Sequence, residues 1–282
     1  MKIANLAGRA VLLGSDGAAD LERASNGKLP SDPVAVLERW DETRELVADL
    51  DVQEWAPFDE TALGPPVPRP RQSLGIGLNY RAHAAESGWA IPEIPLLFSK
   101  LPGSLVGPYD DVLLPSDACD WEVELVLVIG RLAEHVGEET ALDFIAGYSI
   151  GQDISERRVQ RSSPGPQLTL GKSYRTFGPC GPAITTLDEL DDPEDLVIRC
   201  EVNGEEVQAS KTSDLIFGVR ALIAFLSECM PLYPGDLIFT GTPEGVGSAR
   251  RPPRYLVPGD VITSSIEGLG WMRNSCQAAP GS

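Results

Sequence analysis

The sequence predicts a β-rich α+β fold in two unequal parts: a small N-terminal α/β domain over residues 1–65 and a larger domain over residues 66–282. Three observations lead to this prediction. Many short runs rich in Val, Ile and Leu are separated by turn residues, which is typical of strands. Only a few segments have a helical pattern, and a proline-rich stretch divides the chain. We therefore expect sheets to dominate the larger part.

Composition narrows the classes of protein that the chain can belong to. Its 282 residues can bury a large core, and 42% apolar with 23% charged residues is ordinary for a folded globular chain. A net charge of −19 argues against nucleic acid and anionic membrane as partners. No apolar run is long enough to cross a bilayer, and the start of the chain lacks the pattern of a secretory signal. We therefore expect a cytoplasmic protein.

The five cysteines are widely spaced and include no C-x-x-C pair. An odd number without clustering indicates neither a disulfide framework nor a zinc site. We expect all five to be free thiols.

The N-terminal part contains one clear helical segment, "DPVAVLERWDETRELVADL" over residues 32–50. Asp32 and Pro33 have the residue types that favour the N-cap and the first helical position, so the helix should begin there. Residues 64–73, "GPPVPRPRQS", then carry four prolines, which is typical of an extended connector. This connector places the predicted domain boundary near residue 65.

The larger part alternates short strands with a few helices. Strand-like runs occupy residues 73–80, 123–130, 195–207, 235–242 and 259–270. The clearest helix is predicted over residues 213–229, "SDLIFGVRALIAFLSEC". No repeat of fixed period is present, so a repeat architecture is not indicated.

One strand carries an unusual pair of acids. In "CDWEVELVLVIG", residues 119–130, Glu122 and Glu124 point to the same face as Val126 and Val128, because side chains alternate along a strand. Both faces become apolar further along, so the strand should be buried on both sides. Two like charges at the start of a buried strand require a proton, a basic side chain or a metal ion to neutralise them.

Four further segments contain residue types that carry chemistry. His83 and Glu86 are three residues apart, a spacing at which a carboxylate can orient an imidazole on a helical turn, although such pairs are more often exposed. Asp153 follows a strand-like run and suits either a ligand or a helix cap. Lys172 lies between small and aromatic residues, where it could face a substrate or solvent. The glycine-rich turn in "PGDLIFTGTPEGVG", residues 234–247, lacks the features of a nucleotide-binding loop.

Taken together and in order, five segments resemble the fumarylacetoacetate hydrolase family. They are "GLNYRAHAAE", "DWEVELVLVIG", "GQDISER", "GKSYRTFGPCGP" and "LIFTGTPEGVG". The resemblance covers roughly residues 70–277. It implies a mixed β-sandwich roll around a central pocket, a homodimer, and a divalent cation in the pocket.

The resemblance also implies roles for individual residues. The family's metal-binding carboxylates match Glu122, Glu124 and Asp153. Three oxygen ligands without Cys or His suit Mg²⁺ or Mn²⁺. The family's catalytic residues match His83, Glu86 and Lys172. We assign substrate binding to Tyr80, Lys100, Gln160 and Thr242.

The chain departs from the family pattern at two positions, where many relatives have aspartate. Arg158 and Arg175 occupy these positions, and we expect both to lie near the mouth of the pocket. The departures affect the choice of substrate and leave the metal site unchanged.

The chemistry implied by the resemblance is cleavage of a C–C bond in a β-diketo acid of the acylpyruvate or fumarylpyruvate type. His83 and Glu86 would activate a water molecule, and Lys172 with the cation would stabilise the enolate that leaves. The same site could decarboxylate oxaloacetate, or isomerise or hydrate 2-hydroxy-dienoic acids of aromatic catabolism. A catalytically silent binding protein on this fold should have lost a ligand or dyad residue, and none is lost here.

Residues 79–95, "NYRAHAAESGWAIPEIP", have Gly- and Pro-containing exits and little continuous apolar face. We therefore expect a short helix around His83 that is mobile in the free enzyme and closes over bound substrate.

Overall fold

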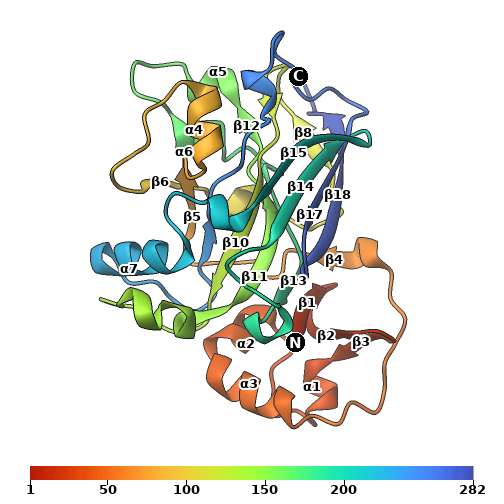
Figure 1. The fold of residues 1–282 in the computed structure, drawn as a ribbon. Coiled ribbons are helices and arrows are strands. Elements are labelled where there is room, and N and C mark those ends of the chain that lie inside the picture. Colours follow the sequence, from red (N-terminus) through yellow and green to blue (C-terminus); the bar gives the residue numbers. More distant parts are fainter. Residues whose placement is uncertain (282) are drawn as a thin grey trace.

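The computed structural model describes residues 1–281 and shows a sheet-rich α+β protein, as the sequence predicts. A large mixed sheet runs through the molecule, and a smaller sheet packs beside it (Figure 1). The helices are short and lie around these sheets.

The large sheet has 11 strands, nine of them in one continuous order. That order is β3 (Gly17–Asp20), β2 (Arg9–Gly14), β1 (Lys2–Leu6), β13 (Gly178–Thr185), β11 (Ile145–Gln152), β10 (Val123–Ile129), β16 (Leu237–Phe239), β5 (Ser73–Gly77) and β6 (Leu96–Ser99). Two short strands pair off this path, β4 (Leu63–Gly64) with β1 and β7 (Leu105–Val106) with β13.

The second sheet has five strands, and a further pair of short strands forms a small ladder. The five are β15 (Glu205–Lys211), β14 (Val197–Val202), β17 (Val261–Ile266), β18 (Gly270–Ala278) and β8 (Val112–Leu114). The small ladder pairs β12 (Ser155–Glu156) with β9 (Cys119–Asp120).

The described residues form α-helices and short 3₁₀ turns. The α-helices are α1 (Leu21–Ala24), α2 (Pro33–Glu38), α3 (Trp40–Ala48), α4 (Arg81–Ser87), α5 (Arg157–Gln160), α6 (Leu168–Gly171) and α7 (Val219–Cys229). The 3₁₀ turns are η1 (Glu60–Ala62), η2 (Pro102–Ser104), η3 (Glu138–Phe144), η4 (Leu187–Glu189), η5 (Thr212–Asp214) and η6 (Gly247–Ala249).

Strand β10 is central to the structure and is buried along its whole length. Its two faces contribute to two different cores. Leu125 and Leu127 join the core between the two sheets, whereas Val126 and Val128 join a second core on the opposite face. The alternation that the sequence predicts for this strand, with both faces covered, is therefore confirmed.

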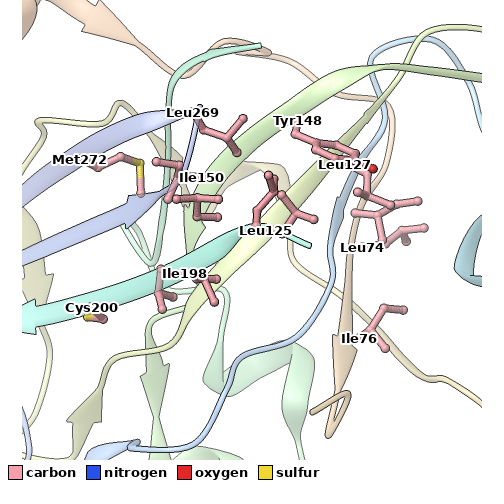
Figure 2. Packing of buried hydrophobic residues seen from close by; sticks show 14 of the residues in the cluster. Leu74, Ile76, Leu125, Leu127, Tyr148, Ile150, Ile198, Cys200, Leu269 and Met272 are labelled. Atoms are coloured by element: carbon pink, nitrogen blue, oxygen red, sulfur yellow. The ribbon is translucent and has the colours of Figure 1, made fainter. Parts of the chain in front are cut away.

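The first core lies between the large sheet and the five-stranded sheet. Figure 2 shows Leu125 and Ile150 of the large sheet close to Ile198 and Met272 of the other. Beta-branched and leucine side chains fill such a space between sheets, because their volume suits a layer about 10 Å thick. This core holds the large sheet and the five-stranded sheet together, and it includes side chains of β10, the strand that carries Glu124 near its start.

The second core joins the N-terminal segment to the large sheet. Leu37 and Trp40 pack with Val126, Val128 and other side chains of the opposite face of that sheet. Strand β1 pairs antiparallel with β13, so the N-terminal strands extend the large sheet. The N-terminal part thus shares both sheet and core with the rest, and its division from it at residue 65 stays a prediction.

Two predicted helices differ in extent from the structure. The segment predicted as one helix over 32–50 forms α2 and α3, because Arg39 between them has a non-helical backbone. The hydroxyl of Thr43 donates to the carbonyl of Val36 at 2.9 Å, which satisfies a group that the break leaves free. Asp32 caps α2 as predicted. The second helix, expected over 213–229, begins only at Val219, after the 3₁₀ turn η5.

The five cysteines are free thiols, as predicted, and only Cys229 is exposed. Within residues 1–281, no helix combines the length and the apolar character needed to cross a bilayer.

The short helices gather at one end of the molecule. In Figure 1, α4, α5 and α6 lie at the end away from the N-terminal helices. Strand β10 begins and β11 ends at neighbouring positions, because Val123 pairs with Gln152. Side chains flanking these two strands are therefore brought together.

The packing of α2 on the large sheet leads to a stability prediction. Leu37 is 1% exposed in the second core, so Leu37→Ala should lower the free energy of unfolding by about 2–5 kcal/mol. Leu132→Ala is the matched control, because Leu132 is 48% exposed and its loss should cost less than about 0.5 kcal/mol. Urea denaturation of both variants measures the difference. Equal effects would show that α2 does not pack on the sheet as described.

Candidate active site

Three acidic side chains, Glu122, Glu124 and Asp153, converge where β10 begins and β11 ends, and we call them the acidic triad. One carboxylate oxygen from each lies within 4.8 Å of the others, and all three side chains are buried. The amide of Asp153 donates to the carbonyl of Glu122 at 2.9 Å, so backbone pairing continues beyond the strands and fixes this approach. The structure thus brings together the three residues that the sequence predicts as metal ligands.

Basic side chains surround two members of the triad. Nζ of Lys172 donates to Oε2 of Glu122 at 2.6 Å and also to Oδ2 of Asp153. Arg157 pairs with Oε1 of Glu122 at 2.7 Å. Nζ of Lys100 donates to Oδ1 of Asp153 at 2.6 Å. Both carboxylates are therefore paired with cations on two sides.

The third member, Glu124, forms no ion pair with any basic side chain in residues 1–281. It accepts one hydrogen bond, from the amide of Gly241 at 2.8 Å. Burial, and then the negative charges of Asp153 and Glu122, raise the pKa of Glu124 well above its ordinary value. Burial alone would also raise the pKa of Glu122, but the charges of Lys172 and a neighbouring arginine outweigh it and hold that pKa at about 2.

This difference within the triad fits a divalent cation. Three buried carboxylates offer oxygen ligands without sulfur or imidazole, which is the donor set preferred by Mg²⁺ and Mn²⁺. The negative charge of Glu124 is unfavourable until a positive charge lies beside it. The residues present therefore suit a hard divalent cation.

The predicted dyad lies on the short helix α4. Nδ1 of His83 is 2.8 Å from Oε1 of Glu86. A carboxylate can only accept, so Nδ1 carries the hydrogen and Nε2 keeps a basic lone pair. Glu86 also accepts from the amide of Gly245 at 3.1 and 3.0 Å, which joins α4 to the glycine-rich turn. Glu86 is therefore placed to orient His83. The short helix is present as predicted, and its mobility stays a prediction.

A cavity of about 160 Å³ connects these groups. It is lined by the acidic triad, His83 and Lys172, and by an apolar wall that includes Leu78, Leu96 and Phe98. A cavity with a few convergent polar groups on an otherwise apolar wall is typical of a small-molecule site.

Two of the residues assigned to substrate binding line this cavity. Gln160 lies beside Arg157, whose Nη1 donates to its Oε1 at 2.9 Å. The hydroxyl of Thr242 donates to the carbonyl of Val123 at 2.9 Å and accepts from Gln208 at 2.8 Å. These bonds fix both side chains at the cavity wall, and their contact with substrate stays a prediction.

The other two residues assigned to substrate binding lie behind the wall. Lys100 has no exposed area and contacts Asp153 and, at 2.9 Å, the carbonyl of Lys172. Tyr80 is also fully buried at the start of α4, where burial raises the pKa of its hydroxyl. Neither side chain lines the cavity, so this placement supports a role for Lys100 in holding the triad rather than in touching substrate.

The two departures from the family pattern, Arg158 and Arg175, are both exposed side chains outside the cavity wall. Arg158 is not among the residues that line the cavity and pairs with Asp117 at the surface. Arg175 is exposed and also absent from the cavity wall. Neither side chain lines the cavity, and their place near its mouth stays a prediction.

Two other arginines line the cavity instead, and sequence reasoning missed both. Arg157 is buried and pairs with Asp120 at 2.8 Å as well as with Glu122. Arg161 follows directly after α5. The only sequence signal was their position just after Asp153, in a polar segment that offers three arginines within five residues.

Comparisons with known proteins agree with this geometry. The family model described as fumarylacetoacetate (FAA) hydrolase C-terminal matches residues 72–277. A mitochondrial oxaloacetate tautomerase of Homo sapiens, FAHD2A, is 42% identical over 253 residues, which are 87% of this chain and 80% of that protein.

Solved structures are similar over nearly the whole chain. A protein named HpcE from Mycobacterium smegmatis is 46% identical with a TM-score of 0.96, covering 99% of this chain and 100% of that one. Maleylpyruvate hydrolase from Sphingobium sp. SYK-6, in complex with manganese(II) and pyruvate, is 28% identical with a TM-score of 0.80 over 99% and 100% of the two chains. The predicted fold is thereby confirmed.

The unpaired charge of Glu124 leads to a metal-binding prediction. Glu124→Gln should weaken Mn²⁺ binding at least about 100-fold, because a charged ligand is lost. The melting temperature of the metal-free variant should stay the same or rise, because glutamine keeps an acceptor for Gly241 and removes repulsion within the triad. Thermal denaturation with and without Mn²⁺ measures both effects.

The control for this experiment is Glu139→Gln, which removes the same charge from an exposed position in η3. Wild type and control should gain melting temperature with Mn²⁺, because a ligand bound only by the native state stabilises it. An undiminished response of Glu124→Gln would show that Glu124 is not a ligand.

Proposed function

The chain belongs to the fumarylacetoacetate hydrolase family, and from this premise we propose that it is a divalent-cation-dependent enzyme that moves a proton beside the ketone of a 2-keto acid. The reaction we assign first is keto–enol tautomerisation of oxaloacetate. The observation that carries this proposal is the dyad base, His83, in one cavity with the acidic triad and Lys172. The human oxaloacetate tautomerase, 42% identical over most of the chain, supports this choice of substrate.

Each side chain has a part in such a reaction. Glu122, Glu124 and Asp153 would hold a divalent cation, which would supply Lewis-acid stabilisation of the negative charge of an enolate. The free Nε2 of His83 can take a proton from the carbon beside the ketone and return it, while Glu86 holds the ring. Burial lowers the pKa of Lys172, but the charges of Asp153 and Glu122 outweigh burial and raise that pKa, so the side chain is an ammonium. It can donate to the oxygen that becomes negative.

Hydrolysis of an acylpyruvate is the second candidate. It is favoured by the oriented His83–Glu86 pair, which could equally deprotonate a water molecule, and by the similarity to maleylpyruvate hydrolase. The two reactions differ in the source of the proton that His83 removes, carbon in one and water in the other. Homodimeric assembly and a cytoplasmic location stay predictions from the sequence.

The two candidates can be separated with the Mg²⁺- or Mn²⁺-loaded protein. Tautomerisation is followed by the loss of enol absorbance of oxaloacetate, with malate dehydrogenase consuming the keto form. Hydrolysis is followed by pyruvate release from acetylpyruvate, with lactate dehydrogenase. We expect tautomerisation to be the faster reaction. Faster pyruvate release would favour the hydrolase, and absence of both reactions would overturn the proposed function.

Replacement of the base gives the first functional prediction. His83→Ala should lower kcat about 10²–10⁴-fold for the reaction observed, because it removes the one imidazole among the described residues that line the cavity, while Mn²⁺ binding is kept. His135→Ala is the matched control, since His135 is exposed, pairs with Glu228 and does not line this cavity. A near wild-type rate for His83→Ala would remove His83 from the mechanism.

Replacement of Lys172 gives the second functional prediction. Lys172→Met should lower kcat about 10²–10³-fold, because a donor to the developing oxyanion is lost. Glu122 and Asp153 keep Arg157 and Lys100 as partners, so the variant should fold and bind Mn²⁺. Restoration of full activity by saturating Mn²⁺ would mean that the lysine serves only to balance charge. Lys211→Met, at an exposed ion pair, is the control.

A further inference from the structure

The cations of the cavity differ in whether their charge is already paired. Lys172 and Arg157 are buried and pair with carboxylates of the acidic triad and with Asp120. Arg161 also lines the cavity, but it is exposed, and its guanidinium makes no hydrogen bond or ion pair with residues 1–281. It is therefore a cation available to a ligand.

We propose that Arg161 binds the distal carboxylate of the substrate, so that the site selects dicarboxylic over monocarboxylic 2-keto acids. This inference rests on the proposed function and names its substrate class. One end of a 2-keto dicarboxylate is its keto-acid group, which the triad end of the cavity would hold. The other end is a second negative charge that needs a partner of its own.

Besides its charged side chains, the cavity wall consists of apolar side chains and of neutral polar ones such as Ser87 and Ser248. Trp89, Leu96, Phe98 and Leu168 are apolar, and an ionised carboxylate against such side chains is unfavourable without a partner. The protein has a net charge of −19, which repels a dianion at long range. A guanidinium offers two parallel N–H donors that match a carboxylate, so Arg161 is the suitable partner among the lining residues.

The backbone holds Arg161 at this position. It is the C-cap residue of α5, and its amide donates to the carbonyls of Arg157 and Arg158 at 3.2 Å each. The loop that follows is closed by the amide of Gln167 donating to the carbonyl of Gln160 at 2.9 Å. The backbone of Arg161 is thus fixed beside the cavity, while its guanidinium is available to bind a ligand.

Arg158 provides a matched control within the same turn of chain. It carries the same charge, but it pairs with Asp117 and does not line the cavity. Arg161→Gln and Arg158→Gln therefore change the net charge equally, and only the first should alter the site.

The binding test needs no turnover. It uses the Mn²⁺-loaded full-length protein and two five-carbon acids, 2-oxoglutarate and 2-oxovalerate, which differ by a carboxylate in place of a methyl group. Titration calorimetry should show 2-oxoglutarate binding to wild type about 10–100-fold more tightly, as expected for one charge-assisted pair. The difference should vanish in Arg161→Gln, stay in Arg158→Gln and return in part in Arg161→Lys.

The kinetic test compares oxaloacetate with its 4-ethyl ester, in which the distal charge is removed. Arg161→Gln should lower kcat/KM for oxaloacetate about 10–100-fold and leave the value for the ester unchanged. Equal losses on both substrates, or a preference for the dicarboxylate that survives in Arg161→Gln, would overturn the inference. Equal affinity of wild type for the two five-carbon acids overturns the inference alone, whereas failure of both acids to bind overturns the proposed function with it.

Discussion

The arrangement of this protein depends on three carboxylates that are buried within 4.8 Å of one another. Like charges at this distance in a buried site repel strongly, so the fold must supply positive charge beside them. It does so from three separate segments: Lys100 follows β6, Arg157 begins α5, and Lys172 follows α6. The segments that close one end of the sheet are thus held there by electrostatics as well as by packing.

The positive charges beside the acidic triad are unevenly distributed, and this uneven pairing creates a site for a cation. The side chains of Glu122 and Asp153 have basic partners, whereas Glu124 finds only a backbone amide among the described residues and has a raised pKa. A hard cation is therefore favoured beside Glu124, while His83 lines the same cavity on a helix attached to the glycine-rich turn through Glu86. Cation site, base and hydrogen-bond donor are brought together by the same paired strands and short helices.

Much of this was accessible from the sequence, because local rules apply to it. The alternation of β10 between two cores follows from the geometry of a strand, and the cap at Asp32 follows from residue type. The spacing of His83 and Glu86 predicted their contact on one helical turn. The break at Arg39 was not accessible, because the segments on both sides of it have helical patterns and no Pro or Gly marks it.

The sequence by itself determined which residue types were available for a metal site, and the ordered motifs determined the family. Only the tertiary structure decided how the charges pair. Lys100 lies behind Asp153, 53 residues further along the chain, and of the arginines after that aspartate one is buried, one pairs at the surface and one is free at the cavity. The physical reason is that side-chain alternation and capping depend on covalent geometry over a few residues. The partner of a charge depends on which distant segments pack beside it, and one set of charges can be paired in many ways.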